Sequence, residues 1–159
     1  MNNLLFNNAM SFKKAGLRCL EEREIDNDSY EMLMTPVVVN LSFSLELYLK
    51  NVLLLKGVSF NRIHYLHKLF DLLDQDTKDQ ILKSYFIKSE YRYVDAKDKP
   101  YEMFLNWFED TLNNHSNLFV KWRYSHETIE NEALECDYGF LLKLIGMLED
   151  LSNRLSTNE

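Results

Sequence analysis

The sequence predicts an all-α fold, an up-and-down helical bundle of about five main helices that forms a single domain over residues 1–159. Only 4 glycines and 2 prolines occur in 159 residues, too few for the many turns of a sandwich or barrel and for a glycine-rich nucleotide fold. Apolar residues recur with helical spacing along most of the chain. A composition of 46% hydrophobic and 27% charged residues is typical of a folded globular chain.

The first helix is predicted over about residues 3–23, where apolar residues fall loosely on one face. The polar run Asp-Asn-Asp-Ser at 26–29 ends this helix, because such residues favour turns. A short apolar piece at 30–34 leads into the next element.

The second helix is predicted to begin with Thr35 as N-cap and Pro36 at the first helical position, where the missing N–H of proline costs nothing. It runs to Lys56, and Gly57 follows as the residue that can turn the chain out of the helix. Its residues are apolar nearly all round, so we expect it at the centre of the bundle.

The second half of the chain shows apolar stripes at helical spacing. In order, they predict a connector at 61–64, a short helix at 66–73, and a helix with its stripe at 81–86 that Asp76 or Thr77 can cap. A helix at 103–112 and a shorter one at 118–122 follow. The last helix is predicted from its cap, Asp137, to Leu155. Residues 89–99 have no apolar period and end at Pro100, which predicts a loop. Residues 127–135 are rich in glutamate, which predicts a solvated connection.

Cysteine usage and hydropathy predict a soluble cytoplasmic protein. Cys19 and Cys136 are far apart and form neither a zinc nor a redox motif, so a reducing compartment is the simplest setting. The N-terminus lacks the basic region and long apolar run of a signal peptide. The longest apolar stretch, Val37–Leu55, includes Glu46 and Lys50, which would be costly in lipid, so we expect no membrane insertion.

The charge distribution is uneven. The formal net charge of −7 weighs against strong non-specific binding to nucleic acid. Two windows, Leu47–Phe70 and Thr111–His126, contain no acidic residue. They hold all four histidines and the basic residues Lys50, Lys56, Arg62, Lys68, Lys121 and Arg123. Chance clustering on solvated helix faces and a local binding surface both account for this pattern.

Glu46 and Lys50 stand four residues apart on the predicted central helix, with the acid before the base, which is the favourable order for an ion pair. Their neighbours are mostly apolar, and charged residues are rarely buried unless they are paired. Either this face looks into a polar cleft, or the pair is a structural device inside the bundle.

His67 opens the short helix at 66–73, where a histidine can cap, pack or act in catalysis. Arg62 precedes it in an Arg-x4-His pattern, which a chain with 6 arginines and 4 histidines can show by chance. These two residues are nevertheless candidates for a phosphate-binding and a proton-transferring group.

Residues 119–127, Phe-Val-Lys-Trp-Arg-Tyr-Ser-His-Glu, contain the chain's highest density of side chains that could bind or react. Trp122 is expected to anchor the core. Arg123 can stack on a ring, pair with a carboxylate such as Glu46, or grip a phosphate with its planar fork. With His126, it could cleave RNA by 2′-hydroxyl attack, since one group moves protons and the other stabilises charge on the phosphate. The same groups also suit simple nucleotide binding.

Several sequence motifs of known chemistry are absent. The chain has no Walker loop, no glycine-rich dinucleotide turn, no HExxH and no GxSxG. We therefore expect no bound metal and no cofactor.

Four pieces of the chain follow one another in a characteristic order. They are Leu-Glu-Leu-Tyr-Leu-Lys at 45–50, Gly57, His-Lys-Leu-Phe-Asp-Leu-Leu at 67–73, and Phe119-x-x-Trp122-Arg123-Tyr124. This series, over roughly residues 36–124, resembles the HEPN superfamily (higher eukaryotes and prokaryotes nucleotide-binding domain). The resemblance implies an up-and-down helical bundle that is commonly dimeric. Many members are metal-independent ribonucleases of toxin–antitoxin, abortive-infection and CRISPR systems, whereas others bind nucleotides or partner proteins.

The ribonuclease members carry Arg-x4–6-His on one late helix, whereas here His126 follows Arg123 after only two residues and Arg62-x4-His67 lies at a connection between helices. The resemblance implies by position a polar set that we expect to converge on one cleft, namely Glu46, Lys50, His67 and Arg123. The candidate catalytic residues are thus Arg123, His67 and His126, and the candidate binding residues are Glu46, Lys50, Arg62 and Lys121.

Three functions remain open from the sequence. The first is an RNA- or nucleotide-binding protein of a toxin–antitoxin or phage-defence system, with or without ribonuclease activity. The second is a non-catalytic interaction module that binds a nucleotidyltransferase or another toxin component. The third is a structural homodimer without a ligand.

Overall fold

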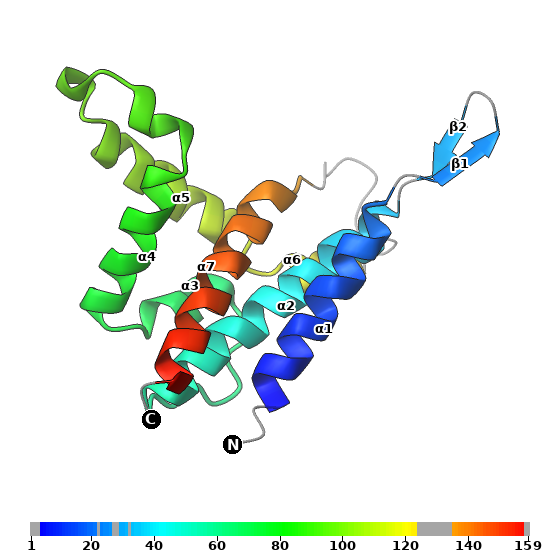
Figure 1. Ribbon diagram of the computed structural model, residues 1–159, viewed down its shortest axis with the longest axis horizontal. Helices are drawn as coiled ribbons and strands as arrows, with labels where there is room; N and C mark the ends of the chain where they lie inside the picture. The colour runs from blue at the N-terminus through cyan, green and yellow to red at the C-terminus, as the bar shows by residue number, and fades with distance from the viewer. Residues whose placement is uncertain (1–3, 22, 27–28, 32, 124–134, 158–159) are drawn as a thin grey trace.

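The computed structural model describes residues 4–21, 23–26, 29–31, 33–123 and 135–157, and it confirms the predicted all-α bundle (Figure 1). The five long helices are α1 (Leu4–Cys19), α2 (Met34–Leu55), α4 (Gln75–Ile87), α5 (Pro100–Asn114) and α7 (Tyr138–Thr157). Two short helices, α3 (Leu66–Asp71) and α6 (Leu118–Arg123), lie where short helices were predicted.

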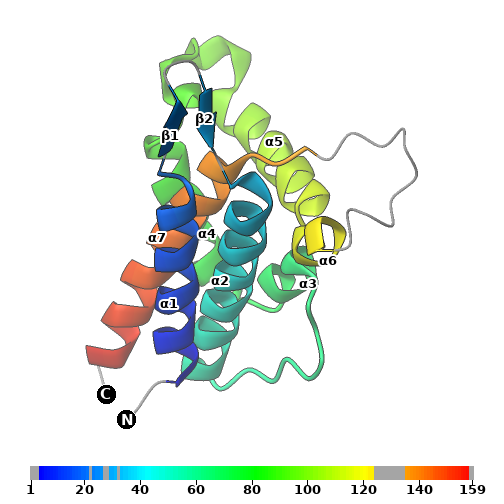
Figure 2. The same cartoon turned by 90° about the vertical axis from the view of Figure 1, so that its right-hand side faces the viewer.

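The central position of α2 is also confirmed. Most of its residues are buried, and its most extensive packing is against α1 and α7, which lie on either side of it in Figure 1. Figure 2 shows α1 running alongside α2. The helix begins at Met34 with Leu33 as N-cap, so the predicted cap at Thr35 is wrong by two residues. Its end is as predicted, because Lys56 is the C-cap and Gly57 takes a φ of 70°. Only glycine adopts that conformation without strain.

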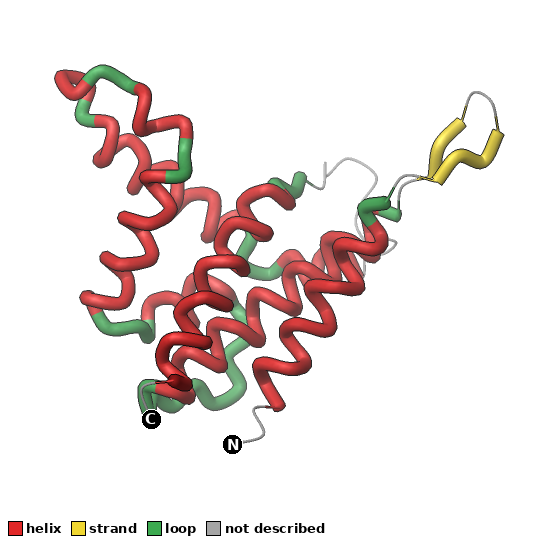
Figure 3. Tube along the Cα trace, in the orientation of Figure 1, coloured by secondary structure: helices red, strands yellow, loops and turns green. Residues whose placement is uncertain are grey.

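The sequence did not predict the β-hairpin that follows the first helix. The first helix ends at Cys19, and the chain then forms an antiparallel hairpin of β1 (Arg23–Asp26) and β2 (Ser29–Glu31). This hairpin projects beyond the ends of α1 and α2 (Figure 3). The strands are too short to show the alternation of apolar and polar residues by which strands are recognised.

The helix α2 is long and apolar enough to cross a membrane by length and composition, but most of it is buried within the bundle. That burial is typical of the core helix of a soluble protein, with which the structure is compatible.

The other helix boundaries follow local chemistry. Asp74, not Asp76 or Thr77, caps α4, because its Oδ1 accepts the Thr77 N–H at 2.9 Å. The loop predicted at 89–99 contains two 3-10 turns, η1 (Glu90–Tyr93) and η2 (Ala96–Asp98).

The predicted cap of the last helix is correct, since Asp137 Oδ1 accepts the Phe140 N–H at 2.9 Å. The buried apolar side chains of all these helices form one contiguous cluster. Of the connection predicted at 127–135, all but the last residue lies outside the described part of the chain.

Candidate functional site

A charged pair lies in the middle of the apolar helix α2. Lys50 Nζ is 2.7 Å from Glu46 Oε1, as the four-residue spacing predicts, and the Glu46 side chain is only 4% exposed. The ammonium group also lies 5.8 Å from the ring centroid of Phe60, which belongs to the connector between α2 and α3. The connector thus packs against the ion pair. Because the pair is buried, removing either charge would leave the other unpaired and would destabilise the fold.

His64 of the same connector joins this pair. Its Nδ1 lies 2.9 Å from Glu46 Oε1, the oxygen that also accepts from Lys50, while its side chain is 65% exposed. A carboxylate can only accept, so Nδ1 carries the proton in this contact and Nε2 is the basic nitrogen of the neutral ring. A buried carboxylate therefore fixes the tautomer and orientation of a histidine that solvent can reach.

Arg62 stands two residues before His64 with a φ of 54° and is exposed. This left-handed conformation costs a non-glycine residue about 1–2 kcal/mol. Such strain tends to persist at functional sites, where the surrounding structure enforces it.

A cavity of about 10 Å³ lies beside the carboxylate. Its walls include Glu46, His64, Ser116 and Phe119, and it has room for about one water molecule. A nucleotide cannot enter it. Any substrate of His64 must therefore approach from the solvent-exposed side of the imidazole.

His67 faces a different environment. Its backbone N–H donates to Ser116 Oγ at 3.0 Å, and its Nδ1 is also in contact with this hydroxyl. The imidazole lines a separate hollow of about 270 Å³ between α3, α4 and α5. Of the set expected to converge, Glu46 and Lys50 are in contact, and the histidine that contacts Glu46 is His64 in place of His67.

The remaining candidate residues lie in α6 or follow it in the sequence. The Arg123 guanidinium carbon lies 5.8 Å from the ring centroid of Phe119, which agrees with the stacking interpretation. Phe119 in turn stacks on Phe43 of α2, with ring centroids 4.9 Å apart. Lys121 is exposed and lines a polar hollow next to His115, whereas His126 lies outside the described residues.

His115 is a polar core residue that sequence analysis did not single out. Its Nε2 accepts the Asp137 N–H at 2.8 Å, so its Nδ1 carries the proton and donates to the Thr111 carbonyl, also at 2.8 Å. Burial lowers the pKa of this imidazole, which keeps it neutral. The residue ties the end of α5 to the start of α7 and has a structural role.

The described residues give little support for catalysis by the Cys136 thiol or for a metal site. Burial, reinforced by Asp137, raises the pKa of the Cys136 thiol to about 12, so it is a poor nucleophile at neutral pH. Over the described ranges, no three His, Cys, Asp or Glu side chains gather in a way that could hold a metal ion.

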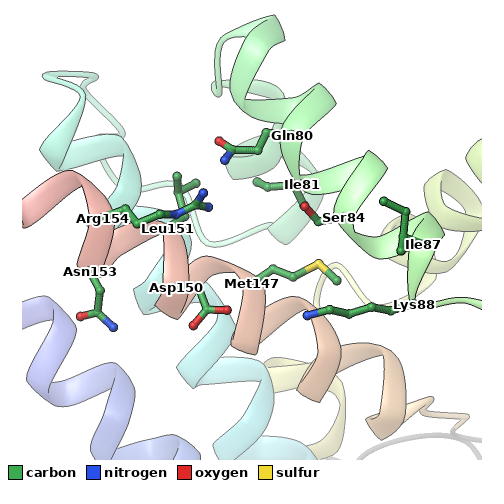
Figure 4. Close-up of a pocket in the computed structure, with 10 residues that line it drawn as sticks. All are labelled: Gln80, Ile81, Ser84, Ile87, Lys88, Met147, Asp150, Leu151, Asn153 and Arg154. Carbon is green, nitrogen blue, oxygen red and sulfur yellow. The ribbon is translucent and has the colours of Figure 1, made fainter.

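A larger hollow of about 550 Å³ lies between α4 and α7 (Figure 4). Its floor is apolar, with the buried side chains of Ile81, Met147 and Leu151, and the exposed Lys88 and Arg154 stand on its rim. None of the predicted site residues in the described part of the chain lines it, so the cluster of Glu46, Lys50 and His64 remains the candidate site.

In comparisons with models of protein families, with curated proteins and with solved structures, nothing matches this chain.

Proposed function

We propose that the protein is a HEPN-like RNA-binding protein that cleaves RNA without a metal ion, as part of a toxin–antitoxin or phage-defence system in the cytoplasm. One observation carries this proposal, namely the exposed imidazole of His64 held at Nδ1 by the buried carboxylate of Glu46. Lys50 donates a hydrogen bond to the same Oε1 oxygen of that carboxylate. A histidine oriented in this way by a carboxylate is the usual form of a general base.

In this proposal, Nε2 of His64 takes the proton from a ribose 2′-hydroxyl while the 2′-oxygen attacks the adjacent phosphorus. The bond from phosphorus to the 5′-oxygen breaks, leaving a 2′,3′-cyclic phosphate and a 5′-hydroxyl end. Glu46 stabilises the imidazolium that forms. The leaving 5′-oxygen takes its proton from a water molecule, because His67, the other candidate of this segment, lines a separate hollow.

Arginine side chains supply the positive charge that the dianionic transition state requires. Arg62 is the first candidate, because the strained backbone presents it two residues from His64. Arg123, next to the Phe119 wall of the cavity beside Glu46, is the second. Lys56 is less suited, since it pairs with Asp74 at 2.8 Å.

The test is incubation of the purified protein with 5′-end-labelled single-stranded and hairpin RNA in EDTA, followed by analysis of the product ends. We expect 2′,3′-cyclic phosphate products from the wild type, and loss of cleavage in His64→Ala and Arg62→Ala. Arg92→Ala is the charge-matched control, because it removes an exposed arginine whose guanidinium lies against Tyr93, outside the site. An inactive but folded wild-type protein would instead favour the non-catalytic interaction module.

We also propose that the protein acts as a homodimer, as the resemblance implies. Light scattering at tens of micromolar tests this, and a monomeric mass would contradict it.

A further inference from the structure

A separate cavity of about 430 Å³ opens where the end of α4, the turn η1, the middle of α5 and the first turns of α7 meet. Among the residues that the structure describes, none lines both this cavity and the one beside Glu46. Four aromatic side chains contribute to its walls: Tyr85, Tyr91, Trp107 and Phe140.

The rings surround Trp107 at differing angles. The centroids of Tyr91 and Tyr85 each lie 5.8 Å from that of Trp107, with interplanar angles of 41° and 58°. Phe140 meets Trp107 edge to face at 84°. Tyr85 and Phe140 are only 1% exposed and belong to the hydrophobic core, so the half-buried rings of Tyr91 and Trp107, inclined at 41° to each other, form the accessible aromatic corner of the cavity. Their faces are electron-rich and attract positive charge.

The charged groups of the cavity point to the same class of ligand. Glu90 of η1 and the N-cap Asp137 of α7 supply two carboxylates, and Lys143 supplies one ammonium, so the described lining residues carry one net negative charge (−1 −1 +1). Lys143 Nζ lies 5.8 Å from the ring centroid of Tyr85, so one wall already faces an ammonium group. Burial raises the pKa of the Tyr85 phenol, and the negative charge of Asp137 raises it further.

We propose that this cavity binds a small organic molecule through a methylated, quaternary ammonium group. The aromatic faces balance the positive charge without requiring N–H donors, and the two carboxylates at the opening complete the compensation. This site is independent of the ribonuclease proposal.

Choline and tetramethylammonium are the probes, and 3,3-dimethylbutanol, the neutral carbon analogue of choline, is the matched control. Trp107 reports binding by its fluorescence in a Trp122→Phe background, and calorimetry on the unaltered chain provides the same constant if that variant fails to fold. We expect saturable binding of choline and none of the neutral analogue at equal concentration.

Three variants locate the site. Tyr91→Leu removes a half-buried wall, and Asp137→Asn removes a charge while an asparagine retains the helix cap. We expect each to weaken choline binding by about 5- to 30-fold. Tyr93→Leu, at a residue that is 75% exposed, should change nothing. Absence of saturation at about 10 mM choline, equal binding of the neutral analogue, or preferential binding of GMP would each overturn the proposal.

Discussion

Nδ1 of His64 lies 2.9 Å from Oε1 of Glu46, although the two residues are 18 positions apart and only one of them is exposed. The contact exists because the connector after α2 turns at Gly57 and returns along the helix to α3. The buried carboxylate of Glu46 thereby fixes the tautomer and orientation of the exposed imidazole of His64.

Replacing Glu46 with glutamine should destabilise the fold and abolish RNA cleavage. The buried Lys50 ammonium would lose its counter-charge, which costs about 3 kcal/mol or more of unfolding free energy. Urea denaturation measures this loss. The double variant Glu46→Gln, Lys50→Met separates the two effects, because removing both charges should restore most of the stability but not the cleavage. A double variant that cleaves RNA would show that Glu46 has no role beyond packing.

Alanine substitutions at two helical glycines should have opposite effects. A Cβ at Gly16 of α1 would lie 2.8 Å from Leu41 Cδ2 and 2.9 Å from its Cγ, so Gly16→Ala should lower the unfolding free energy by about 1–3 kcal/mol. A Cβ at Gly146 of α7 would meet nothing within 4 Å, so Gly146→Ala should raise it by about 0.5–1 kcal/mol through helix propensity. Thermal melts of the pair measure both changes, and equal melting temperatures would refute the close packing of α1 on α2.

The helices were predictable because burial imposes a period on the sequence. The apolar surface of α2, the glycine at its end and the Asp137 cap are all local signals, and each appears in the structure. Contacts through space have no such signal. His64 meets Glu46 only because a connector folds back, and neither the spacing of His64 nor its neighbours indicates this. His115 was missed for the same reason, since one of its partners, Asp137, is 22 residues away.

His115 should make stability depend on pH below 6.5. Burial lowers its pKa in the folded state below the ordinary 6.5, so the unfolded chain binds a proton there more readily than the folded chain does. The stabilisation is complete above pH 6.5 and decreases as the pH falls toward the folded pKa, by at most about 1.4 kcal/mol per pH unit.

The measurement is urea denaturation between pH 5 and 7.5 of the wild type and of His115→Phe. The variant should be less stable at neutral pH, because the Asp137 N–H and the Thr111 carbonyl lose their partner. Its stability should also fall less steeply below pH 6.5. Parallel curves for the two proteins would mean that His115 does not titrate differently on folding.

Gly57 and Arg62 both have a positive φ in the connector between α2 and α3, and substitutions at these two positions should change the unfolding free energy in opposite directions. Gly57→Ala places a side chain at a φ of 70° and should cost about 1 kcal/mol or more. Arg62→Gly relieves a φ of 54° and should be neutral or stabilising by up to about 1 kcal/mol, while it weakens RNA binding. Melting curves and RNA titrations distinguish these effects. A large loss of stability in Arg62→Gly would show that its side chain holds the fold together.

The most direct test of the central claim is the initial rate of EDTA-insensitive RNA cleavage by the wild type and by His64→Ala, measured on preparations with the same melting temperature. The account predicts that the wild type cleaves RNA and that the variant is at least about 100-fold slower, as expected for loss of a general base. A wild-type protein that leaves RNA intact, or a His64→Ala variant that cleaves it at the wild-type rate, would contradict the account.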